Sequence, residues 1–352
     1  MRGRGDRLEA ELAEQGLDRM LVTDLTNVRY LTGFTGTNGA AICGPGVRLF
    51  LTDFRYTERA AAEVSEWETI TVTGDWLAGI ATRLAGKIGF EDDHVSVRSL
   101  TKLEEKLPEG VEAVAAGGTV EALRRVKDAE ELAAIAAASK LADAALRATV
   151  EEGFVGRTER AVADAFEARV RAGGGEPSFD TIVAAGPNGA QPHAEPGPRV
   201  IEPGELIVFD MGAKLDGYCS DGTRTYATGD PGEEGRRVYE TVLAAQQAAL
   251  EAIRPGEKGE DVDAAARKVI DGAGHGEHFG HGLGHGVGLD IHEGPRLSLR
   301  SDDVLAANEV VTVEPGIYLA GDLGVRIEDL VVVTDGGLRN LSSLPKSLDY
   351  VE

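Results

Sequence analysis

The stretch "IVFDMGAKLDGYCSDGTRTY" (residues 207–226) predicts two short strands joined by a turn, and each flank of the turn carries one carboxylate. Asp210 ends the apolar first strand, and Asp221 follows eleven residues later. An even-length turn at 214–217 would place the two aspartates opposite each other, whereas a two-residue turn at 216–217 would place them diagonally. Both registers leave the two side chains on one face, because strand side chains alternate between faces. Carboxylates this close repel each other unless a cation lies between them, although two solvated aspartates on an exposed face would show the same pattern.

A second stretch, "VVTVEPGIYLAGDLGVRIEDLVVV" (residues 310–333), repeats the arrangement and favours the cation. Glu314 ends a Val-rich strand, and Glu328 lies inside the next one. An odd-length loop centred near Asp322 places both glutamates on one face. An acid inside so apolar a strand is costly to bury unless it is paired or coordinated. Two such pairs at corresponding places argue against the interpretation that these acids are merely solvated.

The four carboxylates have neighbours that suit a metal site. Thr223 lies two residues after Asp221 and shares its face, so it is a candidate to hydrogen-bond a ligating carboxylate. Arg326 shares the face of Glu328 in the same way. Four negative charges would balance two divalent cations, and one imidazole would complete a nitrogen and oxygen ligand set. Such ligands favour Mn-like ions, while the imidazole admits Co, Fe or Zn. Two such ions can hold a hydroxide and polarise a carbonyl, which is hydrolytic chemistry.

The histidines are concentrated in "HFGHGLGHGVGLDIHEG" (residues 278–294), which with the residues just before it holds five of the chain's seven. The evenly spaced glycines do not form the G-x-G-x-x-G phosphate loop, and no H-E-x-x-H zinc motif is present. The apolar setting of His285 and His292 favours a strand near a site. His193 stands alone in a Pro- and Gly-rich loop, a setting that on its own is more typical of a surface residue.

The chain of 352 residues is long enough for two domains. Strands and helices alternate to about residue 115, which is typical of an α/β domain. Helices expected at 158–172, 233–253 and 259–273 are interleaved with strand pairs, which indicates an α+β domain. "FVGRTERAVADAFEARV" (154–170) and "IRPGEKGEDVDAAARKV" (253–269) each precede a strand that ends in a carboxylate, so we expect a weak internal duplication.

Composition limits the partners. Asp and Glu number 60 against 36 Lys and Arg, giving a net charge of −24 that would repel nucleic acid and anionic lipid. We therefore expect neither as a partner, whereas an adaptation to high salt stays open. Two cysteines far apart argue against a disulfide framework. No apolar run resembles a signal peptide or a membrane span, so the expected location is the cytoplasm.

Taken together, the motifs resemble those of the M24 or pita-bread metallopeptidases, which include Xaa-Pro dipeptidase (prolidase), aminopeptidase P and, more distantly, methionine aminopeptidase. "HGLGHGVGLDIHE", "VVTVEPGIYL", "GVRIED" and the aspartate pair of 207–226 carry this resemblance. "NVRYLTGFTGTNGA" (27–40) looks like the amino-terminal domain of prolidase and aminopeptidase P. The resemblance implies an α+β pita-bread catalytic domain with an internal pseudo-duplication at 121–352. A smaller creatinase/prolidase-like α/β domain would precede it at 1–120.

The resemblance also implies a site. It assigns five ligands to two divalent ions, with manganese expected first and Co, Zn or Fe as alternatives: Asp210, Asp221, His285, Glu314 and Glu328, of which Asp221 and Glu328 would bridge. His193 and His292 would be non-ligand donors that steady the scissile carbonyl. Glu314 would also act as general base. Arg296 matches a position that lies near the substrate carboxylate in some prolidases, and His281 matches a histidine common before the metal ligand. Gly222 departs from the pattern, because relatives often have a bulkier residue there.

The expected function is hydrolysis of Xaa-Pro bonds in dipeptides or short proline-containing peptides by a metal-bridging hydroxide, in a cytosolic homodimer. One alternative is a pita-bread aminopeptidase with a different preference for the amino-terminal residue. Another is a non-catalytic peptide- or protein-binding module of the same fold, which the retention of all five ligands disfavours. Sequence does not separate a dipeptidase from an aminopeptidase.

Overall fold

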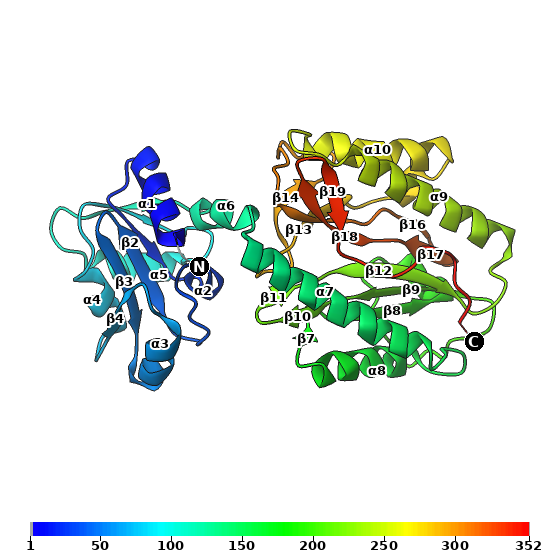
Figure 1. Ribbon diagram of the computed structural model, residues 1–352, viewed down its shortest axis with the longest axis horizontal. Coiled ribbons are helices and arrows are strands. Elements are labelled where there is room, and N and C mark those ends of the chain that lie inside the picture. Colours follow the sequence, from blue (N-terminus) through cyan, green and yellow to red (C-terminus); the bar gives the residue numbers. More distant parts are fainter. Residues whose placement is uncertain (1–2, 352) are drawn as a thin grey trace. The chain divides into compact units, whose positions relative to one another are not determined.

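The chain forms two compact units, Met1–Arg124 and Arg125–Glu352, in a computed structural model that describes residues 3–351 (Figure 1). The division falls at the end of helix α6 (Thr119–Arg125). A boundary at 120/121, as expected from sequence, would cut this helix near its start. Within the described residues, no helix combines the length and the apolar character needed to cross a bilayer.

The amino-terminal unit is an α/β unit built on a mixed sheet with the strand order β4-β3-β2-β1-β5-β6 among the described residues. The two pairings inside β1-β2-β3 are antiparallel and the remaining pairings are parallel. Its strands are β1 (Arg19–Val22), β2 (Ala40–Gly44), β3 (Val47–Thr52), β4 (Glu68–Thr71), β5 (Lys87–Phe90) and β6 (Glu112–Ala115). Its helices before α6 are α1 (Arg4–Gln15), α2 (Leu25–Thr32), η1 (Phe54–Tyr56), α3 (Thr57–Glu63), α4 (Trp76–Ala81) and α5 (Val97–Glu104).

The larger unit places two helix pairs on the outside of its sheets (Figure 1). The helices are α7 (Ala129–Val150), α8 (Glu159–Ala172), α9 (Gly232–Ala252) and α10 (Gly259–Gly272). Helix α7 begins where Asp128 caps it, because Asp128 and Glu131 form a reciprocal capping box. Helices α7 and α8 pack with the strands of the first half, and α9 and α10 pack with those of the second. Each pair buries its apolar stripe against a sheet, which is the main source of its stability.

The strands of this unit fall into small sheets. They are β7 (Glu176–Pro177), β8 (Ile182–Ala185), β9 (Leu206–Met211), β10 (Ala213–Leu215), β11 (Tyr218–Cys219), β12 (Gly222–Ala227), β13 (Gly284–Gly286), β14 (Glu293–Leu297), β15 (Val310–Val313), β16 (Gly316–Leu319), β17 (Leu323–Arg326), β18 (Asp329–Thr334) and β19 (Gly337–Asn340), with short 3-10 helices η2 (Gly186–Ala190) and η3 (Gly276–His278). The sheet orders are β12-β9-β8, β11-β10-β7, β14-β13-β15-β18-β19 and β16-β17.

The two halves of the larger unit repeat one local backbone pattern. The segment before and into α8, residues 156–159, pairs with residues 199–201 through three backbone hydrogen bonds of 2.9–3.0 Å. The segment before and into α10, residues 256–259, pairs with residues 303–305 in the same order at 2.8–2.9 Å. Each half then leads into a strand with a carboxylate at or just beyond its end. The internal duplication expected from sequence is therefore present in the backbone.

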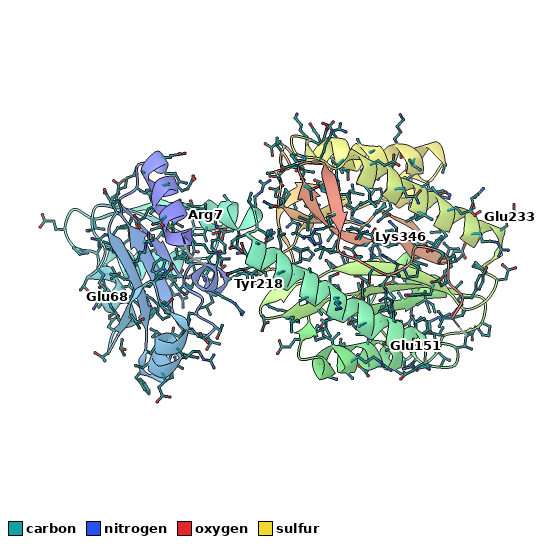
Figure 2. The ribbon with its side chains drawn as sticks, viewed as in Figure 1. Arg7, Glu68, Glu151, Tyr218, Glu233 and Lys346 are labelled. Atoms are coloured by element: carbon teal, nitrogen blue, oxygen red, sulfur yellow. The ribbon has the colours of Figure 1, made fainter. Side chains whose placement is uncertain are left out.

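A buried ion-pair network fastens the carboxyl-terminal segment to the sheets. Asp329 is fully buried and accepts hydrogen bonds from Arg224 at 2.8 Å, Gln246 at 2.9 Å, and Asn340 and Lys346 at 2.7 Å each. Figure 2 shows the position of Lys346 in the larger unit. Burial alone would raise the pKa of Asp329, but the charges of Arg224 and Lys346 outweigh it, and the pKa is lowered. The carboxylate therefore stays ionised with its oxygens fully engaged, on the side of the chain opposite to Glu328.

Replacing Lys346 by Met should lower the free energy of unfolding by about 1–3 kcal/mol, because one charged donor to a buried carboxylate is lost. Denaturant titration measures the change. Lys268→Met, on the exposed face of α10, is the matched control and should leave the free energy of unfolding within about 0.5 kcal/mol of the parent. Equal stability of the two variants would show that the Lys346 contact contributes nothing.

Candidate active site

The aspartate hairpin takes the two-residue turn. Leu215 pairs with Tyr218, and Asp210 pairs with Thr223, so Asp221 lies diagonally across from Asp210 on the same face. The turn residues Asp216 and Gly217 have φ values of 48° and 82°, which is the left-handed geometry that a tight Asp-Gly hairpin requires. Of the two registers considered from sequence, the diagonal one is correct.

The glutamate hairpin brings its two acids directly opposite each other. Gly316 pairs with Arg326 and Leu319 with Leu323, so the three-residue loop is centred on Gly321 rather than Asp322. The same register continues in β15 and β18, where Val313 pairs with Asp329. Extending it by one residue places Glu314 opposite Glu328. The prediction that both acids share a face is confirmed, with the loop centre corrected by one residue.

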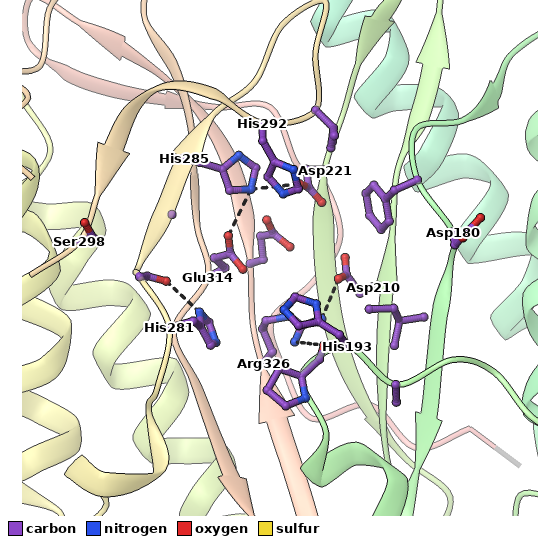
Figure 3. A pocket seen from close by; sticks show the side chains of 18 of the residues that line it. Asp180, His193, Asp210, Asp221, His281, His285, His292, Ser298, Glu314 and Arg326 are labelled. Carbon is purple, nitrogen blue, oxygen red and sulfur yellow. Dashed lines mark hydrogen bonds and ion pairs between the residues drawn. The ribbon is translucent and has the colours of Figure 1, made fainter. Parts of the chain in front are cut away.

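All five expected ligands line one cavity of about 550 Å³ (Figure 3). Carboxylate oxygens of Asp210, Asp221 and Glu328 lie within 4.8 Å of one another. The Nε2 atom of His285 lies 3.5 Å from an Asp221 oxygen and 3.4 Å from a Glu314 oxygen. The structure thus gathers side chains from both halves of the duplicated unit around one point.

His285 has the tautomer that a metal ligand needs. Its Nδ1 lies 3.0 Å from the carbonyl oxygen of Gly286, so Nδ1 carries the proton and Nε2 has a free lone pair. Burial lowers the pKa of His285 to about 4, so the ring is neutral at pH 7. A neutral Nε2 that faces two carboxylates has no proton to share with them. While both carboxylates are ionised, this arrangement is repulsive unless a cation lies among the three groups.

The glycines beside His285 allow the backbone to pass close to neighbouring strands. A Cβ on Gly284 would lie 2.1 Å from the carbonyl oxygen of Thr312, and one on Gly286 would lie 2.0 Å from that of Gly294. Real Cβ atoms do not approach backbone so closely. The His- and Gly-rich stretch is therefore a packed strand and loop, and the glycines fit β13 between β14 and β15.

The carboxylates are crowded and poorly solvated. Burial raises the pKa of Asp221 and of Glu328 well above its usual range, and the neighbouring carboxylates raise both further. Burial also raises the pKa of Glu314 to about 7, although the charge of Arg326 opposes the shift. The buried Oδ1 atom of Asp210 has no hydrogen-bond partner among the residues described. These groups fit divalent cations, because cations would supply the positive charge that the crowded carboxylates lack and a partner for the buried Asp210 oxygen.

Arg326, Tyr318 and His281 form a hydrogen-bonded chain that reaches the ligands. Arg326 donates to Asp210 at 2.7 Å and to the Tyr318 hydroxyl at 2.8 Å. The hydroxyl lies 2.9 Å from Nε2 of His281, whose pKa is lowered to about 4 by burial. Arg326 also donates to Thr223 at 3.1 Å, and Thr223 donates to Glu328 at 2.7 Å. Thr223 and Arg326 therefore each fix one expected ligand.

Tyr318 was missed by the sequence analysis, although a signal was available. It lies four residues after Glu314 on a strand-like run, so alternation places it on the same face. Its ring is almost fully buried, and burial raises the pKa of its hydroxyl, which therefore stays protonated at neutral pH.

The remaining site residues form the walls of the cavity. His193, His292 and Arg296 all line it, and the rings of His285 and His292 lie 4.4 Å apart between centroids. Burial and the nearby charge of Arg296 lower the pKa of His292, so its ring is neutral at pH 7. An apolar wall, which sequence did not reveal, is made by Phe179, Ile182, Pro192, Pro196 and Ile291.

Two family profiles match the chain. That of metallopeptidase family M24 matches residues 133–335, and that of the creatinase/prolidase N-terminal domain matches residues 4–126. An Xaa-Pro dipeptidase of Pyrococcus furiosus is 36% identical over 360 residues, which cover 99% of this chain and 100% of the relative.

Solved structures resemble the whole chain. An Xaa-Pro dipeptidase from Bacillus anthracis superposes with a TM-score of 0.96 at 38% identity, covering 99% of each chain. An X-Pro aminopeptidase from Thermotoga maritima superposes with a TM-score of 0.92 at 36% identity, covering 99% of this chain and 100% of the other. These matches confirm the predicted fold, in which an amino-terminal α/β domain precedes a duplicated α+β pita-bread domain.

Proposed function

Because the chain belongs to metallopeptidase family M24 and is therefore a hydrolase, we propose that it hydrolyses the Xaa-Pro bond of dipeptides or short peptides. The observation that carries this proposal is the convergence of five potential metal ligands on one cavity that His193 and His292 also line. A non-catalytic module has no need to keep four crowded carboxylates at a free-energy cost to folding.

The proposed metal site uses Asp210, Asp221, His285, Glu314 and Glu328. The four carboxylates carry four negative charges when ionised, which two divalent cations would balance. Manganese suits a set dominated by carboxylate oxygens, and one imidazole is compatible with Co, Zn or Fe. Two such ions would generate a nucleophile from water at neutral pH and polarise the scissile carbonyl.

The protein's own side chains would orient the peptide and move protons. His292 is neutral, so one ring nitrogen can donate to the carbonyl oxygen of the scissile bond, and His193 would donate from the opposite lobe. Glu314 would accept a proton from the attacking water. Arg296 would pair with a substrate carboxylate, and the apolar wall gives a proline ring a surface to pack against.

Assays on paired peptides test the proposal. Protein loaded with Mn²⁺ or Co²⁺ should release proline from Ala-Pro or alanine from Ala-Pro-Ala, at least about tenfold faster than it cleaves Ala-Ala or Ala-Ala-Ala. Protein stripped of metal by a chelator is the control. Failure to cleave either proline peptide would overturn the proposal, and cleavage of only the proline-free peptides would indicate a different aminopeptidase.

The same assay separates the two subclasses. The solved relatives include one described as a dipeptidase and one described as an aminopeptidase, at 38% and 36% identity, so similarity does not choose between them. The ratio of kcat/KM for Ala-Pro to that for Ala-Pro-Ala distinguishes a dipeptidase from an aminopeptidase. The homodimer and the cytoplasmic location expected from sequence remain predictions, and sedimentation tests the first.

A further inference from the structure

A buried glutamate outside the cavity holds the loop that carries His193. Glu159, the first residue of α8, is fully buried. One of its oxygens accepts from the backbone N–H of Ala185 at 2.9 Å, and the other from that of Gly197 at 3.2 Å. The side chain of Asn188 donates to both oxygens, at 3.0 and 3.1 Å. One carboxylate thus joins the two ends of the segment 185–197 and a point inside it.

This segment forms one wall of the cavity. Its residues from Pro192 to Pro196 all line the site, and His193 is the second residue of this run. The tip of the loop has a second attachment, because Arg326 donates to the carbonyl oxygen of Pro192 at 3.2 Å. Figure 3 shows His193 beside Arg326 and Asp210. The loop is therefore held at its base by Glu159 and at its tip by the arginine that also binds Asp210.

We propose that Glu159 is a positioning residue for catalysis, which acts by holding the 185–197 loop so that His193 faces the metal ligands. The proposal rests on the role given to His193 above. Glu159 does not line the cavity, so its effect on the reaction would pass through the loop. A misplacement of about 1 Å can lower a rate by about 10², so a donor on a loop needs such an anchor.

In the second half of the unit, another buried acid holds a segment that carries a site histidine. Asp263 on α10 is fully buried and accepts from the backbone N–H of Leu283 at 3.0 Å. It also pairs with Arg267 at 2.6 Å, and Arg267 donates to the carbonyl oxygens of Phe279 and His281. In each half, then, an outer helix contributes a carboxylate that ties down the segment with a site histidine. The repetition favours a positioning role over a chance hydrogen bond.

The contacts of Glu159 require a carboxylate and not an amide. Both oxygens accept from a backbone N–H, so glutamine in either orientation would point its NH2 group at one of these donors. Glu159→Gln keeps the volume and removes one acceptor, which leaves a buried N–H unsatisfied. Asp164→Asn, the same chemical change on the exposed face of α8, is the matched control.

The first test is a double-mutant cycle with His193→Ala, measured as kcat and KM on the better substrate. Glu159→Gln should lower kcat/KM about tenfold, mostly in kcat, and Asp164→Asn should lower it less than about twofold. In the His193→Ala background, Glu159→Gln should lower kcat/KM by less than about twofold, because the side chain that Glu159 positions is already absent. A tenfold decrease of kcat/KM on adding Glu159→Gln to the His193→Ala protein would overturn the proposal and indicate a general effect on the fold.

The second test does not depend on activity. Hydrogen–deuterium exchange of peptides covering 185–197 should quicken in Glu159→Gln and not in Asp164→Asn, while peptides from β15 and β18 stay protected. Unchanged exchange in the loop would overturn the proposal even if activity fell. Faster exchange together with a fully active His193→Ala protein would instead refute the role of His193 and leave the anchor intact. If Glu159→Gln does not fold, Asn188→Ala removes the two Asn188 hydrogen bonds to Glu159 from the loop side and takes its place in both tests.

Discussion

Replacing Glu314 by Gln should reduce kcat by about 10³-fold or more while the protein remains folded. The substitution removes one expected ligand and the expected proton acceptor together, and the loss of general base catalysis alone accounts for about 10²–10⁴. It also removes one of four crowded carboxylates, whose burial raises the pKa of Glu314 to about 7 in the native protein. The metal-free variant should therefore unfold at a temperature no lower than the metal-free parent.

A matched control separates site chemistry from surface charge. Asp322→Asn likewise replaces a carboxylate by an amide, but in the exposed loop of the β16-β17 hairpin, three residues after the end of β16. It should keep kcat within about twofold of the parent value. Steady-state kinetics and thermal unfolding of both variants provide the measurements. Near-normal turnover by metal-loaded Glu314→Gln would show that the base and the site assigned to Glu314 are both wrong.

The sequence was sufficient to predict which face each carboxylate occupies. Side chains alternate with a period of two, so an error of one residue in the centre of a hairpin loop shifts the pairing by two and leaves the face unchanged. This is why Glu314 and Glu328 were placed together although the loop is centred on Gly321 and not on Asp322. It is also why both registers considered for Asp210 and Asp221 gave one answer.

The sequence could not predict contacts between segments that meet only in three dimensions. His193 lies in a loop whose composition is typical of a surface, and only the resemblance pointed to the site. The structure supplies the physical cause, because Glu159 and Arg326 fix that loop from two sides. Neither contact follows from local spacing, since Arg326 lies 134 residues from its partner Pro192.

The position of the boundary between the two units could be predicted only in part from neighbouring residues. A boundary at 120/121 was expected from the resemblance, but Thr119–Arg125 forms helix α6 and Asp128 then starts α7 with a capping box. The capping box follows from neighbouring residues and was predictable as a helix start. Helix α6 packs through Val120, which is fully buried, so tertiary burial contributes to its conformation.

The metal-free protein should lose stability as pH rises from about 6.5 to 7.5, and added Mn²⁺ should reverse this trend. The pKa of Glu314 is raised from 4.5 to about 7 by burial, and those of Asp221 and Glu328 are raised as well. Between the unfolded and the folded pKa of these carboxyl groups the native state binds more protons than the unfolded state, which lowers the free energy of unfolding as pH rises. Below about pH 6.5 the lowered pKa values of His281 and His285 oppose this effect, so the fall is expected above that pH. The slope is about 1.4 kcal/mol per pH unit for each proton concerned.

Metal ligation reverses the sign because carboxylates bind cations in their deprotonated form. The gain in unfolding temperature on adding Mn²⁺ should therefore grow from pH 5 to pH 7, and metal binding at pH 6 should release protons into a weak buffer. Glu314→Gln should release fewer protons under the same conditions, and Asp322→Asn should match the parent. A metal-free protein whose stability rises above about pH 6.5, with no proton release on binding, would show that these carboxylates are not the ligands.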